Sequence, residues 1–147
     1  KEIIDNGLFK KAIRYHHHLM GLLELEKKRY PQAIKYFESA VALEAYGPLS
    51  KSAYLLDSLA LAHYQAGNLD KAAETCGRIA ALTTGRLAYG DTYAKSFYMM
   101  GKISEQKGEK ALAIENYQKF LDLWKNADAG LPEPEDATTR LAKLKAV

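Results

Sequence analysis

The chain has 147 residues, of which 48% are apolar and 27% charged, and its formal net charge is +3. These values fit one ordinary globular domain. The basic residues alternate with acidic ones and form no stripe, so the charge does not indicate a nucleic-acid partner. The single cysteine, Cys76, excludes an internal disulfide and a site built from several cysteines. No apolar run approaches the roughly 18 residues that a membrane span needs, so no membrane insertion is expected.

Seven helices and no strands are predicted. Apolar residues such as Leu55 and Leu59 recur at helical spacing, and short turns interrupt the pattern. Gly67 and Gly108 stand where a helix C-terminus needs a left-handed residue; Lys28 takes that place in the first turn, which predicts a tighter or mildly strained turn. The predicted helices are 8–27, 30–45, 49–66, 69–83, 88–107, 110–126 and 134–145.

The two ends of the chain carry different patterns. The start, KEIIDNG, is too short to assign, and Ile3 and Ile4 would fit the end of a separate, preceding helix. At the other end, the Pro/Gly/Asp-rich link 126–136 leads to a last helix with one narrow apolar stripe. Such a stripe is typical of a helix that closes the end of a stack, and we expect Trp124 to lie beneath it. The stripe consists of Ala137, Leu141 and Leu144.

Three segments of the sequence repeat one pattern. Residues 18–40, 57–79 and 98–120 align without gaps, at offsets of 39 and 41 residues. Each segment has a small residue in its first helix and an alanine in its second, where a larger residue would bury more apolar surface. This predicts that the two helices of each unit approach closely at these positions. The small residues are Gly21, Ala60 and Gly101 in the first helices and Ala33, Ala72 and Ala113 in the second.

This pattern resembles the tetratricopeptide repeat (TPR), a helix-turn-helix unit that stacks into a superhelix. The pairs Met20-Gly21, Leu59-Ala60 and Met100-Gly101 match its Leu-Gly pair, the three alanines match that of its second helix, and Phe37 and Tyr117 match the aromatic residue that follows. Cys76 replaces that aromatic residue in the second unit. The usual tyrosine after the Leu-Gly pair is absent, and the closing proline is displaced to Pro48.

The resemblance implies an all-α TPR-like superhelix, or solenoid, that forms a single domain over residues 1–147. It would contain repeats at about 10–47, 49–84 and 88–126 and a capping helix at 134–145. In the family, one stripe of each first helix lines a concave groove that binds a partner. The matching residues here are Tyr15, His18, Leu22, Tyr54, Asp57, Leu61, Tyr64, Lys95, Tyr98, Lys102 and Glu105.

Four of these groove residues are tyrosines, which offer apolar contact with a polar tip and suit peptide recognition. Alternatively, some of the tyrosines pack between neighbouring repeats. TPR domains that bind C-terminal chaperone peptides use a clamp of Lys, Asn and Arg side chains to hold two carboxylates of the peptide. Only Lys95 matches that clamp, so this ligand type is rejected. Lys95 and Lys102 would still fit an acidic segment, although such lysines are usually just solvated. The residues that do not fit the clamp are His18, Leu22, Ser58 and Met99.

The remaining reactive residue types do not form a recognisable site. Three adjacent histidines on a helix, His16 to His18, point about 100° apart and cannot converge on one ion. His63 is interpreted as a packed or hydrogen-bonded side chain, and Cys76 as a buried, inert thiol. The acids Glu133, Glu135 and Asp136 are explained by the start of the last helix. We therefore predict no enzyme activity, no metal and no cofactor.

The last half of the chain also resembles the C-terminal TPR tails of large multidomain bacterial proteins, in which the array often follows a kinase or cyclase domain. The predicted function is therefore non-catalytic binding of a protein or peptide, as one module of a longer chain. The alternative is a regulatory or sensor region that controls an enzyme domain on the same chain. A homodimer through the exposed N-terminal end of the stack is also considered.

Overall fold

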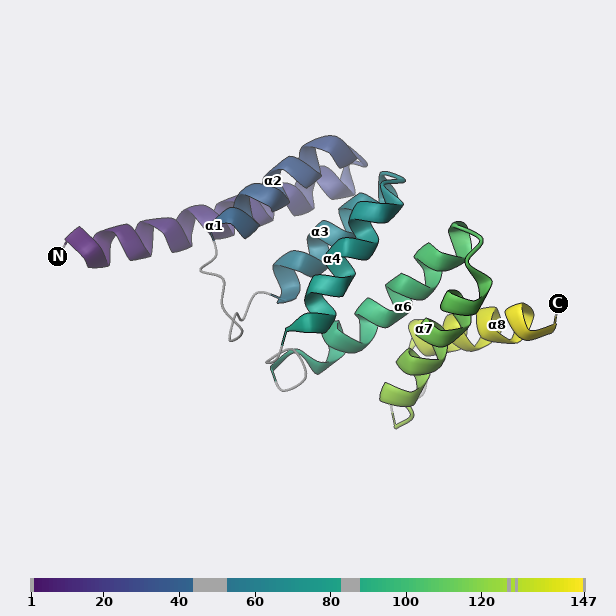
Figure 1. Cartoon of the computed structure of the whole chain (residues 1–147). Helices are drawn as coiled ribbons and strands as arrows, with labels where there is room; N and C mark the ends of the chain where they lie inside the picture. The colour runs from purple at the N-terminus through teal and green to yellow at the C-terminus, as the bar shows by residue number, and fades with distance from the viewer. Residues whose placement is uncertain (1, 44–52, 83–87, 127, 129, 147) are drawn as a thin grey trace.

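The computed structural model describes residues 2–43, 53–82, 88–126, 128 and 130–146. Every element of this part is helical, and the predicted connector at 46–48 lies outside it. Successive helices pair as α1 with α2, α3 with α4 and α6 with α7, and the pairs stack side by side with α8 at the end (Figure 1). The helices are α1 (Glu2–Glu26), α2 (Tyr30–Ala42), α3 (Ala53–Gln65), α4 (Leu69–Ala81), α6 (Gly90–Gln106), α7 (Lys110–Leu123) and α8 (Pro132–Ala146).

Helix α1 is longer than the sequence predicts. It begins at Glu2, so Ile3 and Ile4 belong to α1 and not to the end of a separate helix. Because α2 has only 13 residues against the 25 of α1, the N-terminal half of α1 runs past the end of α2 (Figure 1). Helix α8 also begins earlier than predicted, at Pro132, where a residue without an N–H group is tolerated in the first turn.

The turns inside the three helix pairs have the same backbone geometry. Lys28, Gly67 and Gly108 have φ values of 57°, 76° and 75°. In each turn, the next backbone N–H donates to the carbonyl five residues earlier, as Arg29 does to Glu24 at 2.9 Å. This bond satisfies a carbonyl that the helix end leaves unpaired. A lysine in this conformation is strained relative to glycine, as the sequence predicts for the first turn.

The small residues mark the closest approach between paired helices. A Cβ on Gly21 would lie 2.5 Å from the Phe37 ring, and one on Gly101 would lie 2.6 Å from the Tyr117 ring. Both rings are fully buried, as are the alanines that precede them in the same helices. The prediction that close helix contact demands small residues is therefore confirmed. Those alanines are Ala33 and Ala113, and Ala72 of the middle unit is likewise fully buried.

Helix α8 closes the C-terminal end of the core. Its residues Ala137 and Leu141 are buried in one apolar cluster with Tyr117 and Phe120 of α7. Trp124 packs against the same cluster, as expected, and its ring centroid lies 5.1 Å from that of Phe120. The apolar stripe of α8 is therefore the buried face that the sequence indicates.

Substitution of Gly101 by alanine tests the close contact. We expect Gly101→Ala to lower the free energy of unfolding by about 1–3 kcal/mol, because the buried Tyr117 ring must shift. Gly77→Ala is the matched control: Gly77 lies within α4, exposed, with nothing within 4 Å of an added Cβ. It should raise stability by about 0.5–1 kcal/mol through helix propensity. Urea unfolding measures both, and equal stabilisation by the two changes would disprove the contact.

Candidate functional site

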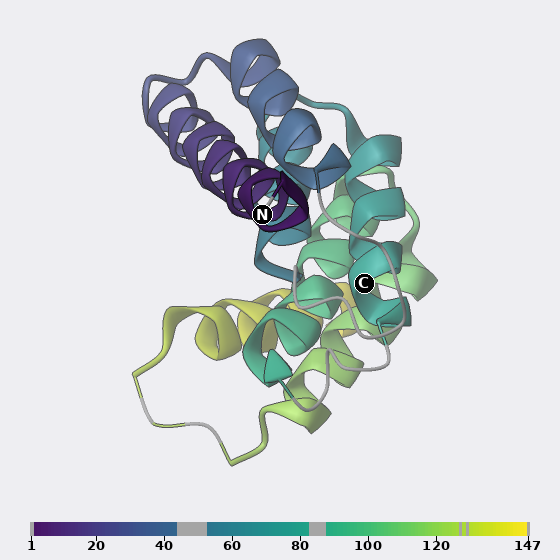
Figure 2. The same ribbon diagram turned by 90° about the vertical axis from the view of Figure 1, so that its left-hand side faces the viewer.

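All the predicted groove residues lie on α1, α3 and α6, the first helices of the three pairs, and we call their surface the first-helix face. These helices share one side of the stack, and α2, α4 and α7 form the other (Figure 2). None of the predicted groove residues is fully buried, and Tyr15 and Leu22 are the most open, with 44% and 37% of their surface exposed. The face is therefore accessible along all three units.

Polar pairs join successive first helices across this face. His18 Nε2 lies 3.0 Å from Ser58 Oγ and so links α1 to α3. The Gln106 side chain of α6 donates to the Tyr64 hydroxyl of α3 at 2.7 Å. These bonds join neighbouring units through His18 and Tyr64, and for Tyr64 this agrees with the alternative that some of the tyrosines pack between repeats. Whether they also contact a ligand stays a prediction.

Helix α8 engages the third unit through both acidic and basic side chains. Lys95 Nζ lies 3.0 Å from Glu133 Oε1 and 5.5 Å from the Trp124 ring centroid. Glu105 Oε2 accepts a hydrogen bond from Arg140 at 2.9 Å and another from the Tyr117 hydroxyl at 2.8 Å. The acidic segment that Lys95 meets is thus the start of α8 in its own chain. The acids of α8 therefore do more than begin the helix, which corrects the sequence interpretation.

The contact between Tyr98 and Asp136 is the centre of this network. The Tyr98 hydroxyl donates to Asp136 Oδ2 at 2.6 Å, and Arg140 Nε donates to the same oxygen at 2.6 Å. Burial raises the pKa of Asp136, but the bonds from Arg140 and Tyr98 outweigh it and leave this pKa below its ordinary value. Burial and the bond to Asp136 raise the pKa of Tyr98. The network therefore favours an ionised Asp136 and a neutral Tyr98.

Lys102 fills the space between two tyrosines. Its Nζ lies 5.0 Å from the Tyr64 ring centroid and 5.4 Å from that of Tyr98, within the range of cation–π attraction. Burial and the nearby Arg140 lower the pKa of Lys102. The third unit's part of the first-helix face is thus already paired within the chain.

Asp57 stands apart from these pairs. It is half-buried near the middle of the first-helix face, and no hydrogen bond or ion pair joins it to another described residue. Burial raises the pKa of Asp57, and Asp91 raises it further while Lys95 opposes both. The neighbouring face residues on α3, Tyr54 and Leu61, are also half-buried. Asp57 is thus a half-buried carboxyl group beside apolar surface, with Lys95 as the positive charge that acts on it.

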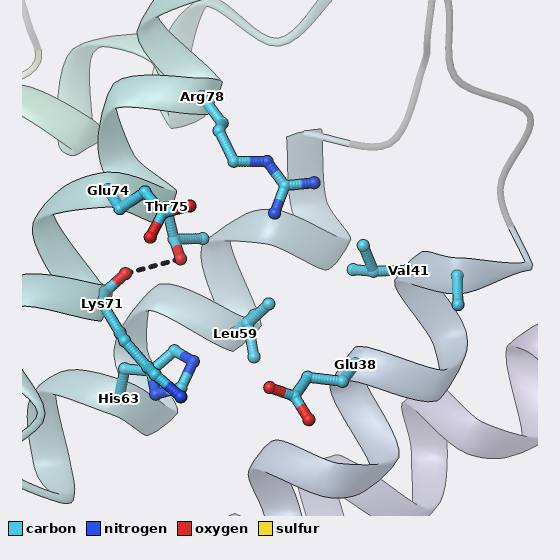
Figure 3. Close-up of a pocket in the computed structure, with 9 residues that line it drawn as sticks. Glu38, Val41, Leu59, His63, Lys71, Glu74, Thr75 and Arg78 are labelled. Atoms are coloured by element: carbon cyan, nitrogen blue, oxygen red, sulfur yellow. Dashed lines mark hydrogen bonds between the residues drawn. The ribbon is translucent and has the colours of Figure 1, made fainter.

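A pocket of about 340 Å³ lies on the opposite side of α3 and was not predicted (Figure 3). Helices α2, α3 and α4 all contribute to it, so no local sequence motif could reveal it. Leu59 and Val41 give it an apolar floor, and acidic and basic side chains mix around it. The charged lining residues are Glu38 and Glu74, which are acidic, and Lys71 and Arg78, which are basic.

His63 lines this pocket and is 3% exposed. Its Nδ1 atom is buried with no hydrogen-bond partner among the described residues. Burial, aided by Lys71, lowers the pKa of His63 against the opposing charges of Glu38 and Glu74. His63 is therefore a packed, neutral histidine at pH 7. Cys76 is also buried, and burial raises the pKa of its thiol to about 12, as expected for an inert cysteine.

The described part of the chain contains neither a metal site nor a membrane-spanning helix. No three His, Cys, Asp or Glu side chains there come together as a metal site. No helix among the described residues has the length and apolar character to cross a bilayer.

The fold defines the class of protein: it is an all-α, TPR-like solenoid. Residues 94–123, which cover most of α6 and all of α7, match the tetratricopeptide repeat family. The chain resembles a solved structure described as the first TPR of Spaghetti (RPAP3) bound to the HSP90 peptide SRMEEVD, with a TM-score of 0.70. The similarity covers 92% of both chains at 19% identity. No curated protein sequence matches the chain.

Removal of one hydroxyl tests the attachment of α8. Tyr98→Phe should lower the free energy of unfolding by about 0.5–1.5 kcal/mol, because Asp136 loses one hydrogen bond. The loss should persist at pH 3.8 and shrink only as the pH falls further, through the lowered pKa of Asp136 in the folded chain. Fluorescence of Trp124, the single tryptophan, reports the unfolding. Tyr36→Phe is the control, since no described residue bonds its hydroxyl; an equal effect of both changes would contradict the role of Asp136.

The pH dependence of stability tests His63. Its folded pKa lies below the ordinary 6.5, so the unfolded chain binds the proton more readily. Stability should therefore fall as the pH drops from about 7.5 to about 5.5. His63→Asn should flatten this slope in urea unfolding. An unchanged slope in His63→Asn would show that His63 is not the group responsible.

Proposed function

We propose that this chain is a protein-interaction module that holds an extended peptide segment along its first-helix face. The fold supports this role, and a structural neighbour of the same fold carries a bound peptide. No catalytic arrangement is part of the proposal, and absence of enzyme activity stays a prediction. The homodimer considered in the sequence analysis would form at the N-terminal end of the stack and is compatible with this role.

The observation that carries the proposal is the difference between the units. The face residues of the third unit are paired with α8 or stacked on each other, as Lys95 with Glu133 shows. In the second unit, no described residue forms a hydrogen bond or ion pair with Asp57, and Leu61 and Tyr54, whose ring packs edge-on against His18, are half-buried. Tyr15 and Leu22 continue this open surface onto α1. The ligand would therefore lie mainly over the first and second units.

The chemistry of this surface favours a peptide with a basic residue beside apolar ones. Asp57 would accept a hydrogen bond from a Lys or Arg side chain, and an ionised partner would also lower the raised pKa of this carboxyl. Tyr54 and Leu61 would cover the apolar neighbours of that basic residue. The first-helix face does not have the set of Lys, Asn and Arg side chains that would bind two carboxylates, as in a C-terminal chaperone peptide. Lys95, which alone matches, is already paired with Glu133.

The wider context of the module rests on the sequence resemblance alone. In that context the chain is the C-terminal part of a larger bacterial protein, and the alternative role is control of a kinase or cyclase domain on the same chain. No contact among the described residues favours this alternative over binding in trans. The activity of the complete protein with and without residues 1–147 distinguishes them, since only the alternative predicts a change.

Peptide selection tests the proposed function. A random peptide library displayed on phage and selected on the 147-residue chain should return sequences in which Lys or Arg adjoins apolar residues. Calorimetry with a selected peptide should show at least tenfold weaker binding to Asp57→Asn and to Leu61→Glu. The peptide SRMEEVD should bind the unchanged chain more weakly than the selected peptides do.

Two leucines on α7 provide matched controls. Leu112 and Leu123 are 47% and 45% exposed and lie off the first-helix face. Leu112→Glu and Leu123→Glu should leave the affinity unchanged, and circular dichroism should show that all variants keep their helices. Peptides that bind Asp57→Asn and Leu61→Glu as tightly as the unchanged chain would disprove the assignment to the first-helix face.

A further inference from the structure

The pocket that His63 lines has two walls of opposite net charge. Helices α2 and α4 each pack against α3 and form these walls, and α3 supplies the floor (Figure 3). The α4 wall carries two basic residues and one acidic residue, a net charge of +1, whereas the α2 wall carries one acidic residue, a net charge of −1. The charged residues are Lys71, Glu74 and Arg78 on the α4 wall and Glu38 on the α2 wall.

Opposite charges face each other across this pocket without meeting. Figure 3 shows the Glu38 carboxylate on one side of Leu59 and the Lys71 ammonium group, next to the His63 ring, on the other. Neither the Glu38 nor the Lys71 side chain forms a hydrogen bond or an ion pair with another described residue. Because the two walls stand apart, a molecule that carries both charges can bridge them, whereas the side chains do not reach each other.

The floor of the pocket is apolar apart from His63. Leu59 and Val41 are buried and present aliphatic surface to the pocket. His63 is also buried, and its Nδ1 atom has no hydrogen-bond partner among the described residues. A buried polar atom without a partner costs free energy, and a ligand that hydrogen-bonds the imidazole would offset that cost. The floor therefore offers a place for an apolar group beside one polar group.

We propose that this pocket binds a small zwitterion, an α-amino acid with an aliphatic side chain. Its ammonium group would lie toward Glu38 and its carboxylate toward Lys71, so that both charges lie beside His63. Its side chain would cover Leu59 and Val41. Walls of opposite net charge favour such a molecule over a simple anion or a simple cation, because either of these would leave one wall without a partner and be repelled by it.

A bound amino acid would connect the first unit to the second. Helix α2 belongs to the first unit and α4 to the second, so a ligand held by Glu38 and Lys71 would bridge the two units. A ligand that binds only the folded chain stabilises it, and this one would stabilise the stacking of these two units. The inference does not depend on the proposed peptide binding, since Glu38 and Lys71 lie outside the first-helix face.

Titration of the isotope-labelled 147-residue chain with L-leucine at constant pH tests the site, with the NMR signals of the His63 imidazole as the readout. L-leucine at millimolar concentrations should shift these signals in a saturable way. Two analogues each lack one of the charges: leucinamide has no carboxylate, and N-acetylleucine has no ammonium group. Both analogues should bind at least tenfold more weakly than L-leucine, because each leaves one wall of the pocket without its charged partner.

Variants of the two walls test whether L-leucine binds in this pocket. Glu38→Gln and Lys71→Met should each weaken its binding at least tenfold. Glu115→Gln, at an exposed position on α7, should leave the binding unchanged, and circular dichroism should show that all three variants keep their helices. The proposal would be overturned by the absence of a saturable shift, or by wall variants that bind L-leucine as tightly as the unchanged chain. Equally tight binding of either analogue would overturn the zwitterion as the ligand.

Discussion

The contact between an aromatic ring and a glycine inside a helix pair sets the geometry on which the rest of the structure depends. The rings of Phe37 and Tyr117 occupy the space that a Cβ on Gly21 or Gly101 would need. This contact fixes how close the two helices lie, and interiors packed at this density allow little adjustment. Each pair can then support the next in the same orientation. The alignment of α1, α3 and α6 into one face is a consequence of that repetition.

The two ends of the described stack differ in how far their apolar surface is covered. At the C-terminal end, α8 covers the apolar cluster around Phe120 and adds charged contacts to Lys95, Tyr98 and Glu105. At the N-terminal end, the equivalent side of α1 lies open. Since a solenoid buries each unit only against its neighbours, an uncovered end exposes a whole helix side. The exposed large apolar side chains of the first-helix face among the described residues, Tyr15 and Leu22, accordingly lie on the first unit.

Much of the fold could be predicted because it is encoded locally and three times over. Gly67 and Gly108 made it possible to predict the turns in which they lie, and the repeated alanines made it possible to predict where paired helices come close together. The start of α1 was predicted wrongly because the residues before Leu8 carry no clear helical period. The contacts of Lys95 and Glu105 could not be predicted, because their partners Glu133 and Arg140 lie 38 and 35 residues away on another helix. The pocket beside His63 was missed for the same reason.

The sequence by itself determined the helical repeats and the positions of close approach, and it predicted the first-helix face as the side on which a partner would bind. These follow from side-chain size, backbone conformation and spacing, which act within one unit. Only the tertiary structure decided which members of that face are free. Tyr98, Lys102 and Glu105 are engaged by other helices, whereas Asp57 is not joined to any described residue by a hydrogen bond or ion pair. A charged or hydroxyl group forms an ion pair or hydrogen bond with whichever group lies close to it in space. Residues far apart in the sequence come that close only when the units have stacked.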